Sequence, residues 1–139
     1  MSVRLGRARM LLACAAAVAL SACENSATAY SVEGTQHSLA LVREQPYFWT
    51  STVNQYIVAS RLPDCQRRIA IHPDATMLTP MEVYPAADRL WALRQGERWY
   101  LVSTRECRVQ DWRDPMPTSL GGRIGVFHLE DGKPVFTQG

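Results

Sequence analysis

The side chains with the clearest chemical potential are His37, His72 and His128, because imidazole is the commonest protein ligand for metals. They lie far apart in the sequence, and scattered histidines are normal in a domain, so we expect no metal site. The chain also lacks the motifs of serine hydrolases, zinc hydrolases, nucleotide-binding loops and dithiol redox proteins. We therefore expect no cofactor and no enzymatic activity.

Acidic pairs and one glycine-rich segment are the next candidates. Glu82 and Asp88 are close enough in sequence to act as an acid–base pair. The same holds for Asp111 and Asp114, but solvated loop positions are the usual state of such carboxylates. The segment Gly121–Gly125 resembles a phosphate-binding loop only superficially, because a β-type run follows it where such a loop leads into a helix. We interpret it as a flexible entry to a strand.

The first 23 residues have three parts: a basic start, an apolar run over Met10–Leu20, and the tetrapeptide Leu20-Ser21-Ala22-Cys23. The apolar run is shorter than the roughly 20 residues that a membrane-spanning helix needs. The pattern resembles the signal and lipobox of bacterial lipoproteins of the proteobacterial type, in which cleavage occurs just before the cysteine. The alternative is an ordinary secretory signal cleaved after Ala22, which leaves Cys23 as a free thiol.

The lipobox resemblance implies a covalent anchor and a location. Residues 1–22 are then a removed signal peptide, and Cys23 carries a diacylglyceryl group and an acyl chain such as palmitate. Two or three acyl chains hold a protein on a membrane with negligible release. In enteric bacteria an aspartate after the cysteine retains a lipoprotein in the inner membrane. Because Glu24 stands here, we expect the outer membrane, with the protein facing the periplasm.

Removal of the signal also changes the charge of the chain. The full sequence has 15 basic and 13 acidic residues. Loss of Arg4, Arg7 and Arg9 leaves 12 basic against the same 13 acidic residues, a formal charge of −1. A nearly neutral domain has no electrostatic footprint for nucleic acid, so we expect no nucleic-acid partner. The lipobox resemblance implies the membrane as one partner, through the lipid on Cys23, and an envelope protein as the other.

The resemblance also leads to a disulfide. The mature chain, residues 23–139, contains Cys23, Cys65 and Cys107. With Cys23 acylated, one pair remains, and the oxidising periplasm favours a Cys65–Cys107 bond. A redox role is the alternative, but the pair lacks the C-x-x-C spacing that tunes such thiols. We predict a structural disulfide.

The remaining pattern predicts the fold. Residues 23–36 are small and polar, which indicates a lipidated flexible tether before a β-rich domain over residues 37–139. Turn signals at Gly96 and at Asp131-Gly132 indicate hairpins, and no segment shows a convincing helical stripe. We predict a mainly β, single-domain antiparallel sandwich or partly open barrel of about seven or eight strands with one disulfide. The expected β-type runs are Ser38–Arg43, Gln55–Arg61, Cys65–His72, Glu82–Tyr84, Arg89–Arg94, Arg98–Arg105, Arg123–Glu130 and Lys133–Thr137.

Two aromatic features are candidate contact sites. Tyr47, Phe48 and Trp49 are consecutive, so on a strand at least one ring faces away from the core. They are either core residues or an exposed anchor for a protein or glycan. The segment Gln110–Gly122, which contains Trp112, is longer than a connector needs, so it is either a contact loop or a cover over a sheet edge.

These features predict a non-enzymatic, membrane-anchored lipoprotein that binds an envelope protein. Small lipoproteins of this kind commonly serve as accessory or assembly subunits, or as inhibitors of hydrolases. The alternative is a glycan- or peptidoglycan-binding module that uses the aromatic residues. The mature domain resembles no family that the sequence alone identifies.

Overall fold

The structure is a computed structural model that describes residues 25–113 and 119–139. These residues form ten β-strands and contain no helix. The strands are β1 (Asn25–Glu33), β2 (His37–Glu44), β3 (Thr52–Arg61), β4 (Cys65–Ala75), β5 (Met81–Ala87), β6 (Leu90–Gln95), β7 (Arg98–Ser103), β8 (Arg108–Trp112), β9 (Gly125–Glu130) and β10 (Lys133–Gln138).

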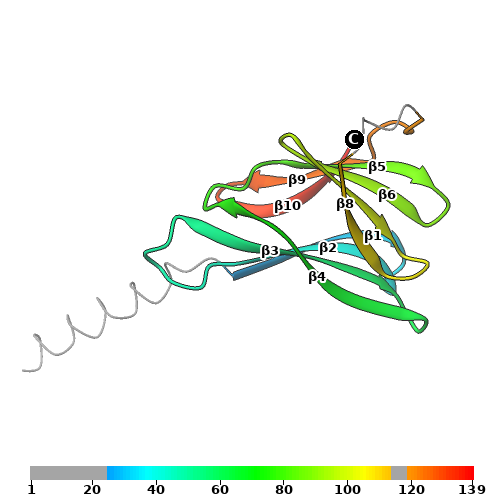
Figure 1. The fold of residues 1–139 in the computed structure, drawn as a ribbon, viewed down its shortest axis with the longest axis horizontal. Helices are drawn as coiled ribbons and strands as arrows, with labels where there is room; N and C mark the ends of the chain where they lie inside the picture. Colours follow the sequence, from blue (N-terminus) through cyan, green and yellow to red (C-terminus); the bar gives the residue numbers. More distant parts are fainter. Residues whose placement is uncertain (1–24, 114–118) are drawn as a thin grey trace, which may run out of the picture.

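Two antiparallel sheets lie face to face (Figure 1). The first has the order β1-β2-β3-β4, and the second has the order β10-β9-β5-β6-β7-β8. Consecutive strands pair within each sheet, except that the β9–β10 hairpin adds to the free edge of β5. The sheets do not close into one barrel, which confirms the predicted mainly β, antiparallel fold in its sandwich form.

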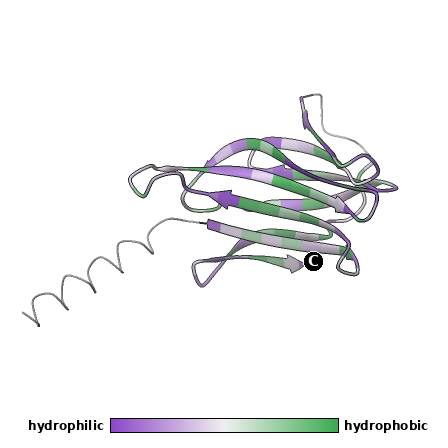
Figure 2. Cartoon of the chain, turned by 90° about the horizontal axis from the view of Figure 1, so that it is seen from below, coloured by the Kyte–Doolittle hydropathy of each residue, from purple (hydrophilic) through white to green (hydrophobic). Residues whose placement is uncertain are grey.

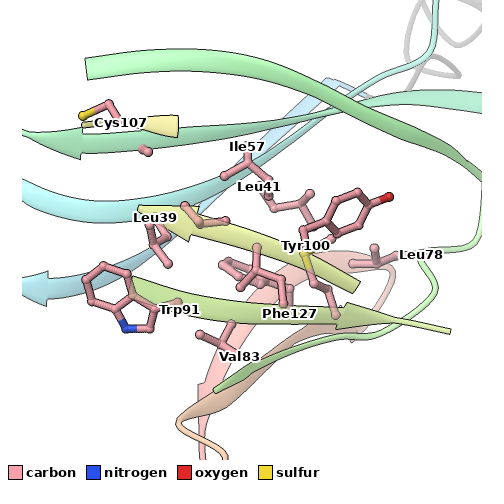
Figure 3. Packing of buried hydrophobic residues seen from close by; sticks show 13 residues of the cluster. Leu39, Leu41, Ile57, Leu78, Val83, Trp91, Tyr100, Cys107 and Phe127 are labelled. Carbon is pink, nitrogen blue, oxygen red and sulfur yellow. The ribbon is translucent and has the colours of Figure 1, made fainter. Parts of the chain in front are cut away.

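The core lies between the two sheets and follows from period-two alternation in the strands. Leu39 and Leu41 of β2 point inward with Ile57 of β3, and they meet Tyr100 and Phe127 of the other sheet (Figure 3). The burial of β2 alternates residue by residue, as expected for a strand with one buried face, and Figure 2 shows apolar and polar residues along the same strands. The burial of these apolar side chains is the main stabilising contribution to the fold.

Strand β1 corrects the prediction of a flexible tether over residues 23–36, of which Cys23 and Glu24 lie outside the described residues. Residues Asn25–Glu33 pair with β2 along most of its length, with Asn25 opposite Glu44. The half-buried positions of β1 alternate with exposed ones, and Tyr30 stacks at a tilt on Phe136 of β10 with ring centroids 4.8 Å apart. The Thr28 hydroxyl donates to the Pro134 carbonyl at 3.2 Å. Backbone pairing and this edge contact therefore order a segment whose composition is poor in apolar residues.

The predicted covalent and turn features are present. Cys65 and Cys107 form a disulfide with a Cα–Cα distance of 6.0 Å, which joins the start of β4 to the turn between β7 and β8. Gly96 and Gly132 have positive φ values of 59° and 75°, as the predicted hairpins require. Cys107 itself lies in the turn before β8, with φ 51°.

The glycine-rich segment before β9 is explained by packing. A Cβ on Gly125 would lie 2.4 Å from the Thr137 carbonyl oxygen and 2.5 Å from the Phe136 ring. A side chain there would push β9 and β10 apart, so glycine permits their close approach. The segment thus leads into a strand, as the sequence indicated.

Candidate functional site

The strand connections gather at the two ends of the sandwich (Figure 1). The near end, named for the start of β1 that it holds, has four connections: the β2–β3 turn (residues 45–51), the β4–β5 loop (76–80), the β6–β7 turn (96–97) and the β9–β10 turn (131–132). The distal end holds the β1–β2, β3–β4, β5–β6 and β7–β8 turns. The register supports this division, because Asn25 pairs with Glu44, and Thr52 pairs with Ala75.

A cleft of about 630 Å³ opens between the sheets at the distal end. Its walls come from the first three of the distal turns and from the strands beside them. The lining residues are Val32, Glu33, Gln36, His37, Arg61, Leu62, Asp64, Asp88, Arg89 and Trp91.

His37 and Trp91 form the inner part of the cleft. The His37 ring meets Trp91 edge-on with centroids 5.6 Å apart, and its Nε2 shares a hydrogen bond with the Thr104 hydroxyl at 2.8 Å. Burial lowers the pKa of His37, and nearby Glu33 opposes this effect while Arg61 and Arg89 add to it. The hydrogen bond and the ring contact hold the His37 imidazole in place in the wall of the cleft.

Arg61 fastens one wall of the cleft to the other sheet. Its Nε donates to the Thr104 carbonyl at 2.9 Å, and its Nη2 donates to the Arg105 carbonyl at 3.0 Å. The same guanidinium forms an ion pair with Asp64. The disulfide joins the same two turns a few residues away. The β3–β4 and β7–β8 turns are therefore held together by one covalent bond and several polar contacts.

The rim of the cleft carries both charges and one apolar side chain. Asp88 forms an ion pair with Arg105 at 3.3 Å across the β5–β6 and β7–β8 turns. Among the described residues, Arg89 has no ion-pair or side-chain hydrogen-bond partner, and its backbone is held at φ 53°. Leu62 is 44 % exposed at the tip of the β3–β4 turn. The lining therefore combines arginines, carboxylates and one exposed leucine, and a polar surface of this kind is typical of the rim of a protein–protein interface.

The candidate aromatic residues lie at the other end of the molecule. Tyr47, Phe48 and Trp49 are 55 %, 65 % and 68 % exposed on the β2–β3 turn. Tyr47 and Trp49 stack with centroids 4.8 Å apart, and Phe48 packs edge-on against Trp49 at 5.0 Å. The interpretation of these residues as part of the core is wrong, because they form an exposed cluster. The role of this cluster as a contact site remains a prediction.

Trp112 has a different setting from the one we expected. It ends strand β8 opposite Trp99, and it is half-buried beside a shallow groove that also includes His72 and Asp111. Residues 110–112 of the expected loop are thus part of a strand, and residues 119–122 lead toward β9. Residues 114–118, including Asp114, lie outside the described part of the chain. Trp112 stays a candidate contact residue.

A buried polar cluster lies between the sheets, close to the end of the sandwich where β1 starts. Arg43 is fully buried, and its Nη1 donates to Asp74 at 2.9 Å and to Gln55 at 3.0 Å. Its Nη2 donates to two carbonyls of the chain that leaves β4. Gln55 and Gln95 exchange hydrogen bonds across the sheets, and Thr79 donates through both its amide and its hydroxyl to Asp74. This network satisfies its own members, so we assign it to stability.

The histidines and acidic residues that the sequence offered as candidates do not come together in one site. His72 is exposed on β4, and His128 bonds the Thr137 hydroxyl on the β9–β10 hairpin. No group of three metal-ligating side chains forms within residues 25–113 and 119–139. Glu82 bonds the Tyr84 hydroxyl and pairs with Arg123, away from Asp88.

Comparisons with family models, with curated proteins and with solved structures find no match to this chain. Over the described residues, no helix is long and apolar enough to cross a membrane. The geometry of the distal cleft, which sequence reasoning missed, is therefore the main guide to function. The sequence offered a weak signal for it, since charged residues, Asp64 and Asp88, fall between the expected β-type runs.

Proposed function

We propose that this chain is a non-enzymatic lipoprotein of the bacterial envelope that binds another envelope protein through its distal cleft. The observation that carries the proposal is the rim of that cleft. Arg61 and the Cys65–Cys107 disulfide hold the rim rigid, and a rigid surface loses little conformational entropy on binding. Such a protein is an accessory or assembly subunit, or an inhibitor of a hydrolase.

The chemistry of the cleft favours a protein as the ligand. The lining includes two arginines, Arg61 and Arg89, and three carboxylates, those of Glu33, Asp64 and Asp88, so the cleft does not select a ligand of one charge sign. Leu62, which also lines the cleft, adds an exposed apolar contact. A partner with matching charges and an apolar pocket fits this surface best.

The proposed anchor is a lipid on Cys23, with residues 1–22 removed as the signal. The chain from Asn25 onward then faces the periplasm, and the glutamate at position 24 favours the outer membrane. The lipobox pattern of Leu20–Cys23 supports this part of the proposal. So does the disulfide, because stable structural disulfides occur in oxidising compartments.

A charge reversal on the rim tests the cleft. The full chain with a short affinity tag after Gly139 is expressed in bacteria, and membranes are cross-linked before purification. We expect Arg89→Glu to reduce recovery of the partner about tenfold, the effect of 1.4 kcal/mol. The matched control is Arg98→Glu, which makes the same charge change on an exposed residue at the near end.

The expected result is one protein recovered in similar yield with the wild type and with Arg98→Glu, and lost with Arg89→Glu. Equal recovery with all three chains would contradict binding through the distal cleft. The alternative function, glycan or peptidoglycan binding, predicts co-sedimentation of the wild type with purified sacculi and no stoichiometric protein partner.

A further inference from the structure

Exposed apolar side chains are concentrated at one end of the sandwich. Over the described residues, five large hydrophobic side chains are exposed, and four of them, Tyr47, Phe48, Trp49 and Met77, belong to the near end. Met77 is 75 % exposed on the β4–β5 loop, which the Thr52–Ala75 pairing places beside the β2–β3 turn. An apolar cluster of this kind on an otherwise polar surface indicates an interaction site.

The position of the start of β1 determines how far the near end can lie from Cys23. Asn25 is already paired with Glu44, the last residue before the β2–β3 turn region. Cys23 precedes Asn25 by two residues, a span of about 7 Å at most. If Cys23 carries the proposed lipid, the near end of the sandwich must therefore rest against the lipid headgroups.

We propose that the Tyr47-Phe48-Trp49 turn is a second membrane anchor that inserts into the lipid–water interface beside the lipidated Cys23. This inference rests on the proposed lipidation and adds to it a binding surface for phospholipid. Tryptophan and tyrosine are the side chains that favour this interface, because each combines an apolar ring with a polar group. Phe48, between them, supplies the most apolar ring.

The turn is built to present these rings. The Thr50 amide donates to the Tyr47 carbonyl at 3.1 Å, and the Gln45 side-chain amide donates to the Thr50 carbonyl at 2.8 Å. These bonds fix the backbone without using the aromatic side chains. In Figure 1 the β2–β3 turn extends past the other connections at this end and past the start of β1. The turn that carries the rings is therefore the part of the domain that would contact the proposed membrane first.

The charges at this end permit contact with headgroups. Glu44, at the base of the turn, is paired with Arg68 at 2.8 Å. The turns of the other sheet carry Glu97 beside Arg98, and the β9–β10 turn carries two carboxylates and Lys133. These opposite charges nearly cancel, so the near end carries no strong net charge that would repel the headgroups. Binding of the turn to the membrane therefore depends on the aromatic and other apolar contacts.

Trp49 itself supplies the probe for the test. The full chain is expressed in bacteria, purified from membranes and reconstituted into phosphatidylethanolamine–phosphatidylglycerol vesicles whose acyl chains are brominated near the headgroup. Bromine quenches tryptophan fluorescence only at short range. We expect quenching in the wild type, its loss in Trp49→Phe, and its retention in the matched control Trp112→Phe on β8.

The mass of the amino-terminal peptide reports lipidation independently of fluorescence, so failure of the lipid on Cys23 is recognised separately from failure of the turn to insert. Equal quenching in all three lipidated chains, or none in the lipidated wild type, would overturn the proposal. Co-sedimentation with sacculi that depends on Trp49, without quenching by lipid, would also overturn it and assign the turn to glycan.

Discussion

Replacing Cys65 and Cys107 together with serine is expected to lower the free energy of unfolding by about 4 kcal/mol. The disulfide closes a ring with a sequence separation of 42 residues. In the chain-entropy description, a loop of this size restricts the unfolded chain enough to stabilise the fold by about 4 kcal/mol. Total stabilities of single domains are about 5–15 kcal/mol, so the loss is a large fraction of the whole.

Chemical unfolding of the mature protein measures this change, and reduction of the wild type is the control. Reduced wild type and the double variant should unfold at nearly the same denaturant concentration, well below that of the oxidised protein. A loss of less than about 1 kcal/mol in both would show that other contacts hold the β3–β4 and β7–β8 turns. The same variant should also lose partner recovery, because the rim of the distal cleft loosens.

Asp74→Ala is expected to destabilise the fold by about 3–5 kcal/mol, the cost of breaking a buried ion pair. The substitution leaves the fully buried Arg43 guanidinium without its carboxylate partner. It also removes the acceptor for the amide and hydroxyl of Thr79. Because Arg43 cannot lose its charge, the protein cannot reduce this cost by deprotonation.

The matched control is Asp64→Ala, which also separates an aspartate from an arginine. The Arg61–Asp64 pair is largely exposed on the aspartate side, so its removal should cost no more than about 1 kcal/mol. Thermal or chemical unfolding of both variants gives the comparison. Equal stabilities would contradict a structural role for the buried cluster.

The sequence predicted the parts of the fold that depend on local pattern. Alternation in β2 and β3, and the turn signals at Gly96 and Gly132, correctly indicated antiparallel strands joined by hairpins. The same alternation placed Arg43 on the face of Leu39 and Leu41, so its burial was readable in principle. Its partner Asp74 was not, because that pairing depends on a bulged register between β3 and β4.

The prediction of a flexible tether in place of strand β1 was the error with the largest consequence. Its small, polar residues carry little apolar signal, and it is ordered by pairing with β2 and by the contact of Tyr30 with Phe136. In a meander, adding or removing one terminal strand moves the chain terminus to the opposite end of the sheet. Without β1, the chain would enter the domain at the distal end, beside His37. With β1, it enters beside Tyr47–Trp49, so under the proposed lipidation of Cys23 the distal cleft faces away from the membrane.

Site-specific photo-cross-linking in living cells tests this orientation most directly. A photoreactive amino acid replaces Leu62 on the distal rim in one full-length chain and Phe48 on the aromatic turn in another. The account predicts a discrete protein adduct from position 62, and lipid adducts without a protein adduct from position 48. A protein adduct from position 48 together with none from position 62 would contradict it.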